Sequence, residues 1–148
     1  MTDTTLSGDL FVTQNVDVKD GATLTLTAGT RVTLCGPYDI EFNNGALHAV
    51  GTAATPIVFE GETAATEWER LFFNGSGGPL LSSTLRHVIV DGGGYGSGTD
   101  AGAIHIRAAN GTDGSGPVLE HITVRNSGAY GIYVRHDESD ATPPLLSN

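Results

Sequence analysis

Apolar and polar residues alternate in short segments along almost the whole chain, and helical spacing is nearly absent. In each segment two apolar residues stand two positions apart, as in Val32-x-Leu34 and Ile57-x-Phe59. Alternation of this period is typical of β-strands that turn one face inward. Clusters of Gly, Asn, Asp, Thr and Pro, which favour turns, separate the segments. The pattern predicts strands at 16–18, 24–26, 32–34, 40–42, 47–49, 57–59, 71–73, 88–90, 104–106, 122–124 and 132–134.

One stretch of the chain is repeated. Residues 85–94 (LRHVIVDGGG) return 34 positions later as 119–128 (LEHITVRNSG), and the positions kept are mainly apolar or turn-forming. A solenoid produces such a repeat because each turn buries its apolar side chains against the next turn. Regular short strands also fit a sandwich or a barrel. The solenoid is favoured because the two-residue turns of antiparallel hairpins are missing, and Asn44-Gly45 fits a corner between two strands.

The predicted strands fall into two columns that recur about every two dozen residues. Members of one column should stack in successive turns of the solenoid, about 4.8 Å apart. The first column contains Leu24 and Leu26, Leu47 and Ala49, Leu71 and Phe73, Ile104 and Ile106, and Ile132 and Val134. The second contains Val32 and Leu34, Ile57 and Phe59, Val88 and Val90, and Ile122 and Val124.

Several segments resemble the repeat of the right-handed parallel β-helix family, which includes pectate-lyase-like and surface-exported proteins. Examples are VKDGATLTLTAGTRVTL, GALHAVGTAATPIVFEG and HITVRNSGAYGIYV. The resemblance covers nearly the whole chain and implies an all-β, right-handed, single-stranded parallel β-helix. It implies one domain over 1–148, with 1–20 as an N-terminal cap or first coil. It does not imply one activity, because this scaffold carries lyases, hydrolases, epimerases, adhesins and spacers.

The end of the sequence resembles the start of another coil. PPLLSN at 143–148 aligns with GPVLEH at 116–121, so we expect 141–148 to begin a further coil and the C-terminal end of the solenoid to be open. An open end exposes apolar side chains and backbone groups that lack partners. We therefore expect either further coils in the natural protein or end-to-end self-association.

The charge balance excludes one class of partner. The chain has 7 Lys and Arg against 17 Asp and Glu, a net charge of -10, which would repel phosphate backbones, so nucleic acid is not an expected partner.

No apolar run approaches the roughly 20 residues of a membrane helix, so membrane insertion is not expected. Cys35 stands alone and excludes an internal disulfide. The first residues lack signal-peptide character, so the protein is either cytosolic or exported with its signal removed, and the resemblance favours an extracellular or cell-surface location.

Rings and guanidinium groups gather on the outward row of the first column. This row reads Thr25, His48, Phe72, His105 and Tyr133, and Arg107 and Arg135 follow its last two strands. Aromatic faces pack on the apolar faces of sugars, and arginine supplies fixed donors. The candidate ligand-binding residues are therefore His48, Phe72, His105, Tyr133, Arg107 and Arg135, with a polysaccharide as the ligand. The alternative is that the rings only stabilise the sheet by stacking.

Other polar residues suggest contacts rather than a cofactor. His87 and His121 should stack at one corner, but two ligands alone make a poor metal site, so no metal is predicted. The pectate-lyase-like relatives use calcium, yet the carboxylates here are too dispersed to name a calcium cage. We expect no cofactor and a solvated acidic rim. Asp91 and Arg125 should form a surface ion pair, and Trp68 should cover a corner of the core.

Catalytic motifs of the resembled enzymes are missing. Neither the polygalacturonase-like set (NTD, DD, GHG, RIK) nor the epimerase-like DPH occurs. Glu60 and Asp91 are the pair of carboxylates that neighbouring turns would bring together, and glycoside hydrolysis needs a pair about 5 to 9 Å apart. We predict no catalytic residue. The expected function is a structural or polysaccharide-binding module. The alternatives are a fragment of a carbohydrate-active lyase or hydrolase and, from the alternating threonines at 23–27, an ice-binding solenoid.

Overall fold

The structure is a computed structural model that describes residues 2–76, 80–96, 101–108 and 116–136. In these residues it contains thirteen strands and no helix, so the all-β prediction is confirmed. The strands are β1 (Thr4–Leu6), β2 (Asp9–Val12), β3 (Val16–Lys19), β4 (Thr23–Leu26), β5 (Arg31–Leu34), β6 (Ile40–Asn43), β7 (Ala46–Val50), β8 (Ile57–Gly61), β9 (Leu71–Asn74), β10 (Thr84–Asp91), β11 (Gly102–Ala108), β12 (Val118–Arg125) and β13 (Tyr130–His136). Accordingly, the described residues offer no helix with the length and apolar character needed to cross a bilayer.

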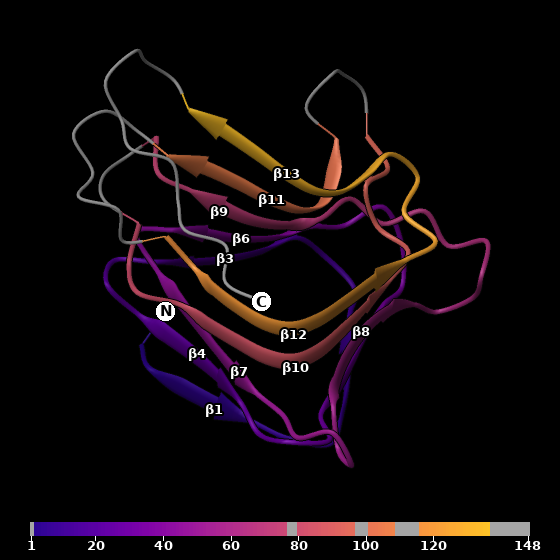
Figure 1. Ribbon diagram of the computed structural model, residues 1–148, viewed down its shortest axis with the longest axis horizontal. Coiled ribbons are helices and arrows are strands. Elements are labelled where there is room, and N and C mark those ends of the chain that lie inside the picture. The colour runs from indigo at the N-terminus through magenta and orange to yellow at the C-terminus, as the bar shows by residue number, and fades with distance from the viewer. Residues whose placement is uncertain (1, 77–79, 97–100, 109–115, 137–148) are drawn as a thin grey trace.

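The strands stack in parallel into two curled sheets (Figure 1). The first sheet has the order β1-β4-β7-β10-β8-β5-β2, and β12 also pairs with β10. The second has the order β13-β11-β9-β6-β3. All pairs among the described strands are parallel. Neighbours in a sheet are distant in sequence, so the chain winds repeatedly round a shared interior in a solenoid-like arrangement.

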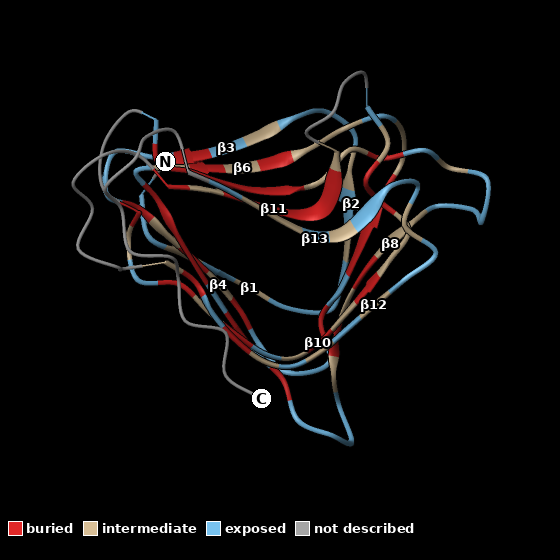
Figure 2. Cartoon of the chain, turned by 45° about the horizontal axis from the view of Figure 1, so that its top comes forward, coloured by how far each residue is buried: buried red, intermediate tan, exposed pale blue. Residues whose placement is uncertain are grey.

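Each turn of the chain has three sides (Figure 2). Strand β10 pairs with β7 through Thr84–Arg86 and with β8 through Val88–Asp91, so it serves two sides of the first sheet. Its bend falls at His87, which has a φ of 49°. Strand β12 bends in the same way at His121, with a φ of 53°. The second sheet closes the third side.

The interior is filled by apolar side chains from all three sides. Phe42 and Phe73 stack with their ring centroids 4.9 Å apart. Trp68 is fully buried at a corner, as predicted. Fully buried residues also come from the middle of the stack, including Leu47, Phe59, Leu85 and Ile104. Burial of this continuous apolar core is the main favourable term that holds the turns together.

The repeated stretch pairs with itself as the sequence predicts. Leu85 lies beside Leu119, and the partners continue in the same register to Asp91 beside Arg125. In the second predicted column, Val88 lies between Ile57 and Ile122. The first member of that column is displaced by two residues, because Val32 is paired with Phe59 rather than with Ile57.

The first predicted column is wrong, because it joins strands from different sheets. Residues 24–26 and 47–49 belong to β4 and β7 of the first sheet. The second sheet contains the other three members, residues 71–73 of β9, 104–106 of β11 and 132–134 of β13. Their neighbours in that sheet, from the earlier turns, are β6 and β3. Each early turn contains three strands, one on each side. Because all three are similarly spaced along the sequence, the spacing does not show which side a strand occupies.

The structure describes the N-terminal end of the predicted domain but not its last residues. Residues 1–20, expected to form a cap or first coil, contain β1, β2 and β3, which make one three-sided turn. The further coil expected at 141–148 lies outside the described residues.

Asp39, just before β6, is expected to make stability depend on pH. Burial, and then the charge of Glu69, raise the pKa of the Asp39 carboxyl above its ordinary value of 3.8, while Arg70 opposes them. The folded protein therefore holds this proton more tightly than the unfolded chain, so stability falls as the pH rises through and above the ordinary value. Asp39→Asn should raise the urea midpoint at about pH 7 and change it little at about pH 3. An equal change at both pH values would contradict this.

Candidate functional site

A stack of rings crosses the second sheet, and we call it the ring stack. Phe72 of β9, His105 of β11 and Tyr133 of β13 are paired in register. The ring centroids of Phe72 and His105 are 4.6 Å apart, and those of His105 and Tyr133 are 5.0 Å apart. Tyr130 stacks on Tyr133 at 5.6 Å, and the guanidinium carbon of Arg70 lies 4.5 Å from the Phe72 ring centroid. The prediction that Phe72, His105 and Tyr133 share one side is confirmed.

The ring stack leaves little surface at its centre for a ligand. Phe72 is 8% exposed and His105 is 3% exposed, because their faces are covered by each other and by their neighbours. Tyr130, at the end of the stack, is 59% exposed. This geometry suits the alternative in which the rings stabilise the sheet. A ligand role for the stack stays a prediction.

The remaining predicted ligand residues are divided between two sheets. Arg107 lies beside Arg135 on β11 and β13, one position past the ring stack, as predicted. His48 was expected in the same row, and that expectation is wrong. It lies on β7 in the first sheet, paired with Thr25, and its Nε2 is 3.3 Å from the Ser82 carbonyl. The cause is the mistaken first column described above.

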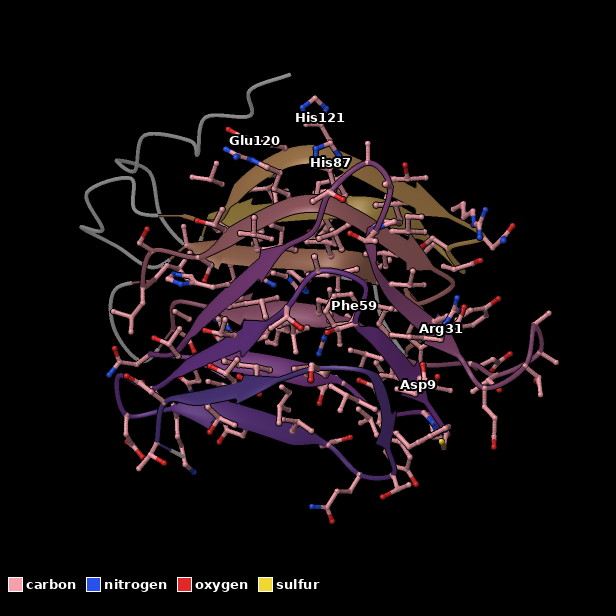
Figure 3. The ribbon with its side chains drawn as sticks, turned by 90° about the horizontal axis from the view of Figure 1, so that it is seen from below. Asp9, Arg31, Phe59, His87, Glu120 and His121 are labelled. Carbon is pink, nitrogen blue, oxygen red and sulfur yellow. The ribbon has the colours of Figure 1, made fainter. Side chains whose placement is uncertain are left out.

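His87 and His121 stack at the corner where β10 and β12 bend (Figure 3). Their ring centroids are 4.5 Å apart and their planes differ by 7°, which confirms the predicted stack. Throughout the described ranges, no three His, Cys, Asp or Glu side chains gather as a metal ion would require. The pair is therefore a contact between neighbouring turns of the chain.

A hollow of about 530 Å³ lies where β8, β10 and β12 end, and we call it the corner groove. It is bounded by the end of β8 and the loop that follows, by the turn after β10, and by Asn126 after β12. Its polar and aromatic lining includes Glu60, Glu62, Thr66, Asp91, Tyr95 and Asn126. The walls thus come from three successive turns of the chain.

Ion pairs hold two carboxylates at the edge of the groove. Glu60 and Asp91 are partners in adjacent strands, and Asp91 is the partner of Arg125. Arg125 Nη2 lies 2.8 Å from Asp91 Oδ2, which confirms the predicted pair, and Glu60 pairs with Arg31. Asn126 Nδ2 donates to Asp91 Oδ1 at 2.7 Å. Each partly exposed pair contributes at most about 1 kcal/mol, so its main effect is to fix the direction of the carboxylate.

The floor of the groove rests on Trp68. The indole Nε1 donates to the Asp91 carbonyl at 3.2 Å. Gly92 and Gly93 follow with φ of 85° and 74°, and a Cβ on either would lie 2.9 Å from the Trp68 ring. The turn therefore needs glycine for two reasons, its left-handed backbone and its close approach to the indole.

Tyr95 forms a wall of the groove. A Cβ on Gly128 would lie 2.8 Å from Tyr95 Cε1, so the ring lies directly against the Gly128 backbone. The Gly128 N–H donates to the Gly93 carbonyl at 2.8 Å, and the Tyr95 N–H donates to the Trp68 carbonyl at 3.3 Å. Contacts from two turns thus hold the ring at the hollow.

Comparisons with known proteins identify no relative of this chain. No family model, no curated protein and no solved structure matches it.

The sequence alone predicts part of the groove and not the rest. It singled out Glu60, Asp91 and Arg125, but not Tyr95 or Asn126. One signal for Asn126 was present. It stands 34 positions after Gly92, and it has a φ of 54°, which Asn tolerates better than most residues. Tyr95 carries no such signal, because its position depends on a turn outside the repeat.

Proposed function

We propose that this chain is a polysaccharide-binding module built as a right-handed parallel β-helix, and that the corner groove holds a neutral sugar unit. The observation that carries the proposal is the Tyr95 ring beside Asp91 and Asn126 in a hollow of about 530 Å³. Sugar sites combine an aromatic surface for the apolar face of the ring with fixed polar groups for its hydroxyls. The right-handed winding is supported by the rule that about 98% of parallel crossovers have this hand.

The charge of the protein favours a neutral ligand over a uronic-acid polymer. The chain has a net charge of -10, and Glu60, Glu62 and Asp91 line the groove. These carboxylates would repel an anionic polymer, and they accept hydrogen bonds from hydroxyl groups. An exported or cell-surface location, where polysaccharides are available, belongs to the same proposal and rests on the resemblance described above.

Glycan binding by matched variants tests the proposal. Tyr95→Ala removes the ring, and Asn126→Gly removes the amide while keeping the left-handed backbone accessible. Each should weaken binding to neutral glycans by about tenfold or more. Tyr130→Ala removes an exposed ring outside the groove and should leave the binding of short neutral oligosaccharides, which occupy a single groove, unchanged.

Two results would count against the groove. Failure of the unmodified protein to bind any neutral glycan would contradict the proposed function. Loss of binding in Tyr133→Ala, with full binding in Tyr95→Ala, would move the site to the ring stack.

Glycoside hydrolysis is the second candidate, because Glu60 and Asp91 lie in adjacent strands and both line the groove. A retaining hydrolase uses two carboxyl groups about 5 Å apart. Here both groups are already engaged by guanidinium groups, which is a poor arrangement for the carboxyl that must donate a proton. Release of reducing sugar from a neutral polysaccharide, abolished by Glu60→Gln, would favour the enzyme over the binding module.

A further inference from the structure

Among the described residues, the N-terminal end of the stack is an open apolar surface. Strands β1, β2 and β3 are end strands, and no strand that the structure describes pairs with their outer edges. Between them lies a hollow of about 520 Å³ lined mainly by apolar side chains, including Leu6, Leu10, Val12 and Val16. These four residues are only partly buried, although their equivalents in later turns belong to the core. An edge of this kind is a template for another set of strands.

The other end of the stack presents the matching surface. Strand β12 pairs only with β10, and β13 pairs only with β11, within the described ranges. Ile132 is 39% exposed there, and Tyr130 is 59% exposed. The strands at both ends run in the same direction and follow the same three-sided outline. A second copy placed over the end would therefore continue the parallel pairing.

One column of charges runs from end to end and has opposite signs at its two limits. We call Asp9, Arg31, Glu60, Asp91 and Arg125 the charge column. Asp9 is the strand partner of Arg31, and Asp91 is the strand partner of both Glu60 and Arg125. The column steps by two residues between these two groups, because the strand partner of Arg31 is Val58, and the Arg31 side chain spans the step to pair with Glu60. The column begins with a carboxylate in the first turn and ends with a guanidinium in the last described one. In Figure 3 Asp9 lies below Arg31, and His121 lies at the upper end of the stack.

We propose that the protein assembles head to tail, with β12 and β13 of one molecule docked on β1, β2 and β3 of a second copy. In this arrangement the strand register places Arg125 of one copy beside Phe11 of the next, two residues from Asp9. Arg31 spans the same step to pair with Glu60, so Arg125 can pair with Asp9 across the contact, and the apolar hollow is covered. Copies joined in the opposite sense, with two N-terminal ends meeting, would place Asp9 near Asp9.

Backbone groups of β2 are directed toward the docking partner. The carbonyls of Gly8 and Val12 accept hydrogen bonds from the N–H groups of Arg31 and Cys35, at 3.0 and 2.9 Å. Successive residues of a strand point their peptide groups to alternate sides. The N–H of Phe11 therefore points away from β5 and toward the open edge, where a strand of the next copy would accept its hydrogen bond.

This contact is heterologous, so it does not close on itself and should produce growing rods. Each added copy would place another corner groove along the same side of the rod. A long polymer could then occupy several grooves at once, which raises its overall affinity without any new contact. The assembly itself does not depend on the proposed function.

Sedimentation at increasing protein concentration tests the assembly. At about 0.15 M salt, where charges are screened beyond about 8 Å, the average mass should rise past that of a dimer. Phe11→Pro removes the outward N–H and is tolerated at an edge position. It should raise the concentration required for assembly by about tenfold or more. Val50→Lys is the matched control, because Val50 is also exposed, at 44%, but lies on β7 inside the stack.

Charge reversal provides the sharper test. Asp9→Arg and Arg125→Asp should each weaken assembly, since each places like charges at the contact. An equal mixture of the two variants should regain assembly, because every contact in an alternating rod again joins opposite charges. Circular dichroism of each variant confirms that it is folded. The proposal is overturned if the mixture assembles no better than its components, if the mass stays at the monomer value, or if growth stops at a dimer.

Discussion

Replacing Gly45 by alanine is expected to lower the free energy of unfolding by about 3 kcal/mol or more. Gly45 is buried at the corner between β6 and β7, directly against β3. A Cβ at this position would lie 2.2 Å from the Val18 carbonyl oxygen and 2.6 Å from its carbon. Both are backbone atoms, so the first two turns would have to move apart. Chemical denaturation followed by circular dichroism measures the loss.

Gly96→Ala is the matched control for this substitution. Gly96 is exposed, and no atom lies within 4 Å of the place where its Cβ would stand. Its effect should stay within about 0.5 kcal/mol. Equal effects of the two substitutions would mean that the contact with Val18 does not determine the stability of this corner.

Trp68→Ala should cost about 3 to 5 kcal/mol, the usual range for a fully buried large aromatic residue. The indole fills a corner of the core and donates its only hydrogen bond to the Asp91 carbonyl. Loss of the ring would leave a cavity, and the Asp91 carbonyl would lose the hydrogen bond that it accepts from the indole. Because the stability of an ordinary domain is about 5 to 15 kcal/mol, much of it would be lost. Urea denaturation provides the measurement.

Trp68→Ala should also affect glycan binding more strongly than it affects the overall fold. Gly92 and Gly93 lie on the indole, so the floor of the corner groove should collapse in the variant even where the turns remain folded. We expect glycan binding to disappear before the secondary structure does. Val50→Ala is the control, since Val50 is 44% exposed on β7, away from the groove and from both ends of the stack, and its truncation should cost less than about 1 kcal/mol. Retention of full binding in Trp68→Ala would contradict the role assigned to the indole.

Sequence patterns were sufficient to predict the fold class and the strand register of the turns that repeat most clearly. Residues 85–94 and 119–128 pair in the predicted register because their inward positions, such as Val88 and Ile122, can be buried in only one way. The same argument correctly placed Asp91 beside Arg125. Turn residues also carried information, since Asn44 has a φ of 53° at the predicted corner.

The candidate site was harder to predict, for two physical reasons. Strand spacing alone does not show which side of a three-sided turn a strand occupies, so His48 was assigned to the wrong sheet. Loop residues also lack the periodic constraint that acts on strands. Thr66 and Tyr95 meet at the corner groove because of the paths of two irregular loops. Alternation of apolar residues contains no information about such paths.

The bends at His87 and His121 have a mechanical consequence. Strands β10 and β12 continue without a break from one side of the stack to the next, so no loop separates those two sides. A pulling force transmitted along the backbone would have to break the hydrogen bonds of both sides in a single event. The later turns should therefore resist tearing as whole units, whereas the earlier ones, with short separate strands, would yield one side at a time.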